Sequence, residues 1–188
     1  MERRIAWLAA AVLTLSCAHG STLVENDTAM NIDDSSPQAT ESAPAFAIRA
    51  ALINVNEIEL GRLELSRAFD GQIRGYALSE VTDHVRMNED LHHLAKERGW
   101  TLPRQADPDH RALEDRMQHT SGPDVDAVYV HATITDHVEA VSFFQRYVRT
   151  GDDPDLVAWA RRNLTVLEKH QDRAEQANAW VQPSIIIR

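Results

Sequence analysis

Residues from about 46 to 182 show long stretches of helical periodicity with few helix-breaking residues. Apolar side chains recur there at three- and four-residue spacing, which indicates helix faces turned toward a core. No alternating strand pattern competes with this periodicity, so the predicted fold class is all-α. We expect a four-helix bundle domain over residues 46–182, with a short extra helix in the central crossover. The four long helices are predicted at roughly 46–69, 72–98, 124–149 and 154–181.

Two Asp-Pro pairs predict where helices begin. Asp107-Pro108 is expected to open the short helix and Asp153-Pro154 the last long one. An aspartate can cap the free N–H groups of a first turn, and proline suits the first helical position.

Three of the nine histidines fall within the apolar stripes of three different long helices: His84, His137 and His170. On the first helix, Glu57 lies close to Val55 and Ile58, and the small Gly61 follows one turn later. The helices of a bundle share one interior. We therefore expect the three imidazoles and Glu57 to converge at one level.

Three imidazoles with one carboxylate are suitable ligands for Zn²⁺ or Cu²⁺. The sequence therefore predicts a metal site formed by Glu57, His84, His137 and His170. A metal-free alternative stays open, because a buried glutamate and buried histidines could also satisfy one another in a polar core.

The ten-residue segments "YALSEVTDHV" (76–85) and "YVHATITDHV" (129–138) place the same Asp-His pair on two helices. Asp83 and Asp136 could orient metal-ligating residues by contacting them without touching the metal, or they could face solvent at the edge of the bundle. Tyr76 and Tyr129 are expected to be core aromatics. The sequence predicts surface positions for His92, His93, His110, His119 and His131.

The first twenty residues, "MERRIAWLAAAVLTLSCAHG", have a basic start followed by an apolar run too short to span a bilayer. This pattern predicts a signal peptide over residues 1–20. The segment "LTLSC" is similar to a bacterial lipobox, so Cys17 is a candidate for lipidation, although Thr14 departs from the usual leucine. Ordinary cleavage after "AHG" is the alternative. Cys17 is the only cysteine, which excludes an intramolecular disulfide.

Residues 21–45 are rich in Ser, Thr, Asp, Asn and Pro and contain no basic residue. Such a segment cannot bury enough apolar surface to offset its chain entropy, so we expect a disordered tether.

The formal net charge of −10 argues against a nucleic-acid partner, which would require a cationic surface.

Several segments of the chain resemble a family of bacterial ferritin-like domains of unknown function found in exported or outer-membrane proteins. The matching segments are "NEIELGRLEL", "VTDHVRMNEDLHHLAKERGWTLP", "SGPDVDAVYV", "DHVEAVSFF" and "GDDPDLVAWARRNLTVLEKH". The resemblance implies a ferritin-like four-helix bundle and a location in the bacterial envelope. It implies no biochemical activity.

A di-iron centre of the ferritin type is not expected. Such centres need a Glu-x-x-His pair on each of two helices. The residues three positions before the stripe histidines are instead Val81, Ile134 and Leu167. Glu80 lies four positions before His84, but no acid stands four positions before His137.

Three functional hypotheses follow. The leading one is a non-enzymatic bundle that binds one transition-metal ion. It is exported to the periplasm and held at a membrane by a lipid anchor, and the outer membrane is the first candidate for that membrane. The second is a mononuclear metal-dependent enzyme using the same residues, with a vacant coordination position. The third is a metal-free structural or interaction module whose histidines respond to pH. The sequence indicates no protein partner.

Overall fold

The computed structural model describes residues 41–181, all of which belong to one helical domain. The predicted signal peptide, Cys17 and most of the predicted tether lie outside the described residues. The all-α prediction is confirmed, because the described residues form five helices and no strand.

The helices are α1 (Ala43–Arg67), α2 (Gly71–Glu97), α3 (Pro108–His119), α4 (Pro123–Thr150) and α5 (Pro154–Val181). These bounds agree closely with those predicted, except that α1 begins three residues earlier than expected. Both Asp-Pro starts are confirmed. The Asp107 side chain accepts a hydrogen bond from the backbone N–H of His110, and Asp153 accepts one from that of Leu156.

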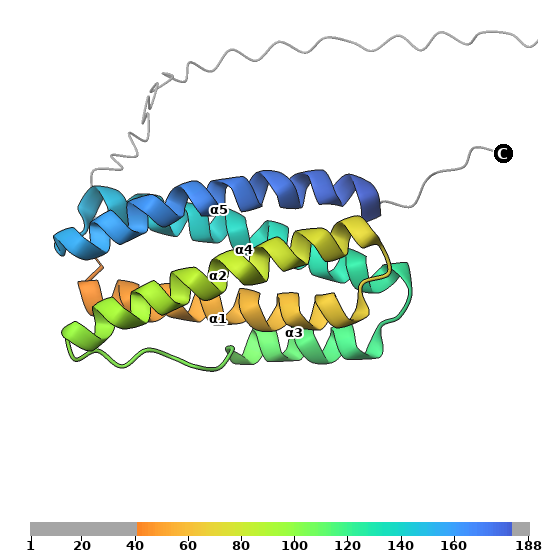
Figure 1. The fold of residues 1–188 in the computed structure, drawn as a ribbon, viewed down its shortest axis with the longest axis horizontal. Coiled ribbons are helices and arrows are strands. Elements are labelled where there is room, and N and C mark those ends of the chain that lie inside the picture. Colours follow the sequence, from red (N-terminus) through yellow and green to blue (C-terminus); the bar gives the residue numbers. More distant parts are fainter. Residues whose placement is uncertain (1–40, 182–188) are drawn as a thin grey trace, which may run out of the picture. The chain divides into compact units, whose positions relative to one another are not determined.

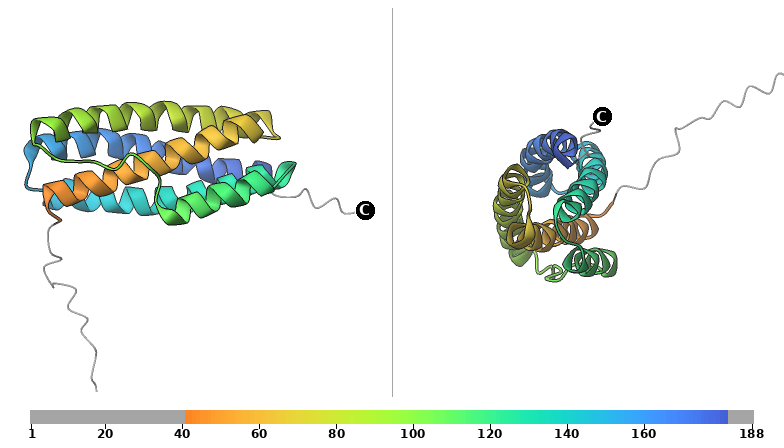
Figure 2. Two further views of the ribbon diagram at one scale, coloured as in Figure 1. Left: turned by 90° about the horizontal axis from the view of Figure 1, so that it is seen from below. Right: turned by 90° about the vertical axis from the view of Figure 1, so that its right-hand side faces the viewer.

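The four long helices pack as a bundle around a shared interior (Figure 1). Helix α1 packs chiefly on α2, and α4 on α5, while α2 also contacts α5 and α1 also contacts α4. The short helix α3 packs against α1 and α4, outside the ring formed by the long helices (Figure 2). Within residues 41–181, no helix combines the length and the apolar composition needed to cross a membrane.

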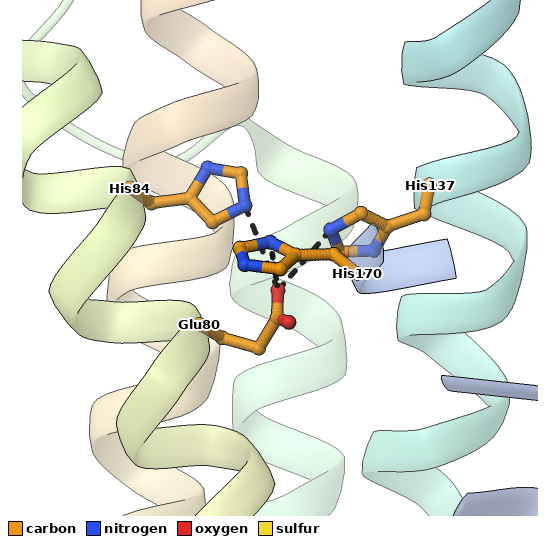
Figure 3. A group of neighbouring side chains, drawn as sticks. All are labelled: Glu80, His84, His137 and His170. Carbon is orange, nitrogen blue, oxygen red and sulfur yellow. Dashed lines mark ion pairs between the residues drawn. The ribbon is translucent and has the colours of Figure 1, made fainter. Parts of the chain in front are cut away.

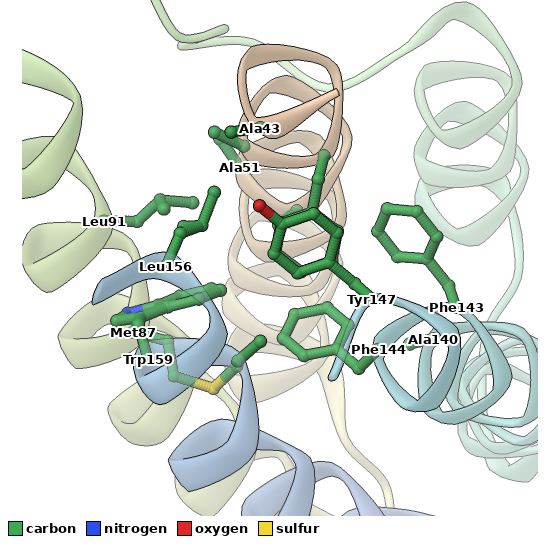
Figure 4. Packing of buried hydrophobic residues seen from close by; sticks show 14 of the residues in the cluster. Ala43, Ala51, Met87, Leu91, Ala140, Phe143, Phe144, Tyr147, Leu156 and Trp159 are labelled. Carbon is green, nitrogen blue, oxygen red and sulfur yellow. The ribbon is translucent and has the colours of Figure 1, made fainter. Parts of the chain in front are cut away.

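The core consists of two apolar clusters at different heights in the bundle. One is aromatic and is built around Phe46, with Tyr147 stacked on it at a ring-centroid distance of 3.7 Å. Figure 4 shows Phe143, Phe144, Tyr147 and Trp159 of this cluster. The other contains Leu60, Ile73 and Tyr129.

A layer of buried polar residues separates the two clusters. Every long helix passes from one cluster to the other, and most of the buried polar side chains fall between the two apolar stretches of their helix. The residues of this layer are Asn54, Asn56, Glu57, Glu80, His84, Thr133, His137 and His170. A buried polar group without a partner lowers the free energy of unfolding. This layer is therefore expected to be less stabilising than the two apolar clusters.

Candidate metal centre

His84, His137 and His170 meet in the polar layer. They come from α2, α4 and α5, and the three centroid distances between their rings are 5.4–5.6 Å. All three side chains are almost fully buried, with at most 2% exposed. The expected convergence of these histidines is therefore confirmed. It arises because each ring occupies the apolar stripe of its own helix.

The carboxylate at the centre of the three rings belongs to Glu80. It lies one turn before His84 on α2, and Figure 3 shows the rings directed toward it. Its Oε2 atom is 3.1 Å from His137 Nε2, 3.1 Å from His170 Nδ1 and 3.6 Å from His84 Nε2. One ligand atom from each of the four residues lies within 4.8 Å of the other three.

The other nitrogen of each ring, which points away from Glu80, has its own partner. His84 Nδ1 is 3.0 Å from Asn54 Oδ1, and His137 Nδ1 is 2.8 Å from the backbone oxygen of Thr133. His170 Nε2 is 3.1 Å from Asp83 Oδ2. All three partners are acceptors, so each outer nitrogen carries the ring proton. The inner nitrogen of a neutral ring is then left with its lone pair free.

The inner nitrogens lie at ion-pair distance from Glu80, but none of these contacts has the alignment of a hydrogen bond. His84 Nε2, His137 Nε2, His170 Nδ1 and both oxygens of Glu80 are buried without a hydrogen-bond partner. Four groups that offer only lone pairs repel one another unless a cation or a proton lies between them. With bonds of about 2.0–2.1 Å, neighbouring ligand atoms of a tetrahedral zinc site lie about 3.3 Å apart. The distances around Glu80 Oε2 are close to that value.

The charges within the four-residue cluster are strongly coupled. Burial would raise the pKa of Glu80, but contacts with His137, His170 and His84 outweigh it and hold this pKa well below the usual range. Burial opposes the protonation of His137, but the carboxylates of Glu57 and Glu80 raise its pKa. Burial lowers the pKa of His84 to about 4 in spite of Glu80. Without a metal, the cluster would hold one ion pair between Glu80 and His137.

The family described as Domain of unknown function (DUF4142) matches residues 29–177. The chain belongs to the DUF4142 family. The crystal structure of a DUF305 fragment from Deinococcus radiodurans is similar, with a TM-score of 0.66 and 13% sequence identity, over 73% of this chain and 95% of that chain. At this identity the likeness shows the fold alone. No curated protein matches the sequence.

Membership of DUF4142 confirms the expected family of unknown function. The ferritin-like part of that expectation stays a prediction, because neither comparison carries it.

In this DUF4142 domain, Glu57 lies beside the cluster and not within it. Its side chain is 1% exposed and its Oε2 atom has no hydrogen-bond partner. Burial raises the pKa of Glu57, with the charge of His137 acting in the opposite direction. The carboxylate that touches the three rings is Glu80, whereas the sequence assigned that place to Glu57. The role of Glu57 as a metal ligand stays a prediction.

A sequence signal for Glu80 was available. Glu80 precedes His84 by four residues, and this spacing puts two side chains on one face of a helix. The Glu80–His84 pair is not part of the di-iron pattern, however. Its spacing alone therefore did not distinguish Glu80 from Glu57 as the carboxylate of the site.

The two aspartates of the repeated Asp-His pairs have different partners. Asp83 contacts His170, as a residue orienting a metal ligand would. Asp136 contacts His110 Nε2 at 3.2 Å, and the other nitrogen of His110 is 3.0 Å from Asp107 Oδ2. The expectation that His110 is a surface residue is therefore wrong in part, since its side chain is only 18% exposed and links α3 to α4. Tyr76 and Tyr129 are buried, as expected of core aromatics.

Proposed function

We propose that this DUF4142 domain binds one transition-metal ion, Zn²⁺ or Cu²⁺, through Glu80, His84, His137 and His170. The observation that carries the proposal is the convergence of three imidazole nitrogens and one carboxylate, all buried and none hydrogen-bonded on its inner side. A cation offsets their mutual repulsion and the cost of burying the Glu80 charge.

The donor atoms select the class of metal. Imidazole nitrogen suits zinc and copper, whereas calcium and magnesium prefer sites made of oxygen ligands. A bridged di-iron pair would need more carboxylates than the single one in the cluster. The proposed occupant is therefore one ion, and the scaffold that holds it is a ferritin-like four-helix bundle with α3 in its crossover.

The proposed role is non-catalytic. A catalytic zinc needs an open coordination position and a path for substrate, and here all four groups are at most 2% exposed. A mononuclear metal-dependent enzyme is the second candidate. It is favoured by a cavity of about 200 Å³ that Glu57 lines close to the cluster.

A metal-free structural or interaction module is the third candidate. The buried ion pair between Glu80 and His137 would then serve only to hold α2 and α4 together. Metal analysis separates this reading from the first two.

We further propose that the domain is exported to the periplasm and held there at a membrane surface. The outer membrane is the first candidate for that membrane. The signal-like residues 1–20, the lipobox-like Cys17 and the polar segment 21–45 support this location. Labelling of cells with a radioactive fatty acid tests it. The wild-type chain should take up the label, whereas Cys17→Ser should not; an unlabelled wild-type chain removes the anchor from the proposal.

The metal proposal is tested on protein purified without an affinity tag. Elemental analysis should find one ion per chain, and addition of Zn²⁺ or Cu²⁺ to the chelator-treated protein should raise its melting temperature. Glu80→Gln should lower the affinity at least a hundredfold, because it replaces a charged ligand with a neutral amide. His131→Gln, at an exposed position of α4, is the matched control and should bind as the wild type does. Absence of bound metal, together with no thermal shift for either ion, would rule out the proposed site.

A further inference from the structure

We propose that the cavity beside Glu57 is the port through which the metal ion reaches the buried cluster, with Glu57 as the residue that passes the ion inward. This inference rests on the proposed function and concerns how the same site is filled. It assigns a kinetic role to Glu57, which lies outside the group of four residues in mutual contact.

The cavity lies where α1, α3 and α4 meet, and its volume is about 200 Å³. A water molecule occupies about 30 Å³ of liquid volume, so a partly hydrated ion fits. Ten residues line it: Arg49, Leu52, Ile53, Asn56, Glu57, Asp107, His110, Asp136, Glu139 and Ala140. Four of these carry carboxyl groups, and two of the four, Asp107 and Asp136, already contact His110. The carboxyl oxygens of Glu57 and Glu139 also line the cavity, and such oxygens are suitable partners for a passing divalent cation.

Glu57 lines this cavity and also lies close to the cluster. Its carboxyl group interacts electrostatically with His137 and Glu80, which belong to the cluster, and with Asp136 and His110, which line the cavity. Its Oε2 atom is buried with no hydrogen-bond partner. A buried carboxyl group with an unused oxygen is costly, and a cation passing from the cavity would displace its proton and supply the missing partner.

A second route by which the ion could reach the cluster passes Asp83, but the contacts of Asp83 argue against it. Asp83 lies next to His170 and its side chain is 30% exposed, so it could also attract a cation. However, it already contacts His170 Nε2 at 3.1 Å and forms an ion pair with Arg86, also at 3.1 Å. An ion arriving there would have to displace both partners, whereas the Oε2 atom of Glu57 has none to lose.

Uptake kinetics test the port directly. The metal-free full-length chain is mixed with Zn²⁺ in a stopped-flow instrument, and uptake and release are followed by competition with a zinc-sensitive dye. A residue that lies on the path, and binds the ion only in passing, changes both rates by the same factor. Glu57→Gln should therefore slow uptake and release about tenfold each and leave the dissociation constant within twofold of the wild-type value.

Glu59→Gln is the matched control. Glu59 lies on the same helix, but it is exposed and lines a different cavity, so both rates should stay unchanged. Wild-type kinetics in Glu57→Gln would overturn the port. A weaker equilibrium affinity with unchanged uptake would also overturn it, because that result identifies Glu57 as a ligand.

Leu52 offers a second test that leaves the charges untouched. It lines the cavity and is only half-buried, so Leu52→Trp should narrow the cavity and slow uptake, whereas Leu52→Ala should widen it and accelerate uptake. Equal rates in the two variants would overturn the port. Failure of the wild-type chain to bind Zn²⁺ would instead refute the proposed function, so the two failures are distinguishable.

Discussion

Asp83 on α2 lies 3.1 Å from His170 on α5, and so it contacts a histidine of another helix and not its own neighbour His84. Asp136 on α4 does the same with His110 on α3, at 3.2 Å. In both copies of the repeated Asp-His pair, the histidine points into the four-residue cluster while the aspartate contacts a histidine on a neighbouring helix. Only Asp83 contacts a ring of the cluster; Asp136 instead holds α3 against α4.

The contact between Asp83 and His170 should affect metal affinity without contributing a ligand. Asp83→Asn keeps the size of the side chain but removes the charge that fixes and polarises the ring of His170. Loss of such a supporting carboxylate typically costs about 10- to 100-fold in affinity, and we expect a loss of that size in a zinc competition titration. Asp90→Asn, at an exposed position of the same helix, is the control. Wild-type affinity in Asp83→Asn would show that His170 needs no support.

The contacts of His110 should make the docking of α3 depend on pH. Burial acts to lower the pKa of His110, but Asp136 and Asp107 outweigh it and raise this pKa from 6.5 to about 9. Since the folded-state pKa lies above the unfolded one, the stabilisation is fully present below pH 6.5 and is lost as the pH rises through about 9.

His110→Gln should therefore lower the free energy of unfolding by about 1–2 kcal/mol at pH 6, and by much less at pH 10. Urea titrations at the two pH values measure this difference. At pH 6, the amides of α3 should exchange their hydrogens faster in His110→Gln than in the wild type. His119→Gln, in the exposed last turn of α3, controls for the loss of an imidazole. A difference that is equal at both pH values would contradict the assigned protonation of His110.

Helix positions and the inward-facing histidines could be predicted from the sequence because both depend on local periodicity. The stripe that buries Leu167 also buries His170, and the caps at Asp107 and Asp153 act within three residues of themselves. Each of these features is fixed inside one helix, so a pattern of three- and four-residue spacing is enough to reveal it.

The choice of carboxylate depended on contacts between helices, and here the sequence prediction differs from the structure. Glu57 and Glu80 are both buried on faces turned to the interior. Which of them touches the three rings depends on the relative rotation and height of α1 and α2, and local spacing does not determine these. The burial of His110 has the same origin, because its partner Asp136 lies on another helix.

Glu64 provides a second pH dependence, of the kind expected for a buried acid. Burial, and then contact with Asp126, raises its pKa from 4.5 to about 8. Asp126 is already held by the backbone N–H groups of Phe69 and Asp70, at 2.8 and 2.7 Å. The stabilisation from protonated Glu64 is therefore fully present below pH 4.5 and is lost as the pH rises through about 8.

Glu64→Gln should remove this loss, because glutamine resembles the protonated acid and can donate to Asp126. We expect the variant to match the wild type at pH 5 and to be more stable by about 2–3 kcal/mol at pH 9. Urea unfolding in the presence of a chelator measures the effect without a contribution from bound metal. The exposed Glu59→Gln should show no such gain. A Glu64→Gln variant that is less stable than the wild type at pH 9 would show that the fold stabilises ionised Glu64, and hence that the pKa of Glu64 is not raised.

Two glycines in the α1–α2 pair should respond in opposite directions to alanine. A Cβ atom added at Gly61 would lie 2.7 Å from Val81 Cγ2, whereas one added at Gly75 would have no neighbour within 4 Å. Val81 is β-branched and has one strongly preferred rotamer in a helix, so its methyl group cannot easily swing away and α1 must move from α2. Gly75→Ala should therefore raise the free energy of unfolding by about 0.5–1 kcal/mol through helix propensity alone. Gly61→Ala should lower it by about 1 kcal/mol in spite of the same propensity gain.

The Gly61 variant should also weaken zinc binding, because α1 carries Asn54, which holds the outer nitrogen of His84. Thermal or urea unfolding and a zinc titration on the two variants provide the comparison. If both alanines stabilised the chain equally, Val81 would have room to yield, and the spacing of α1 and α2 would not be set by Gly61. A destabilised Gly61→Ala that retained wild-type zinc affinity would show that the cluster tolerates the displacement of α1, and hence that α2, α4 and α5 hold the metal without its help.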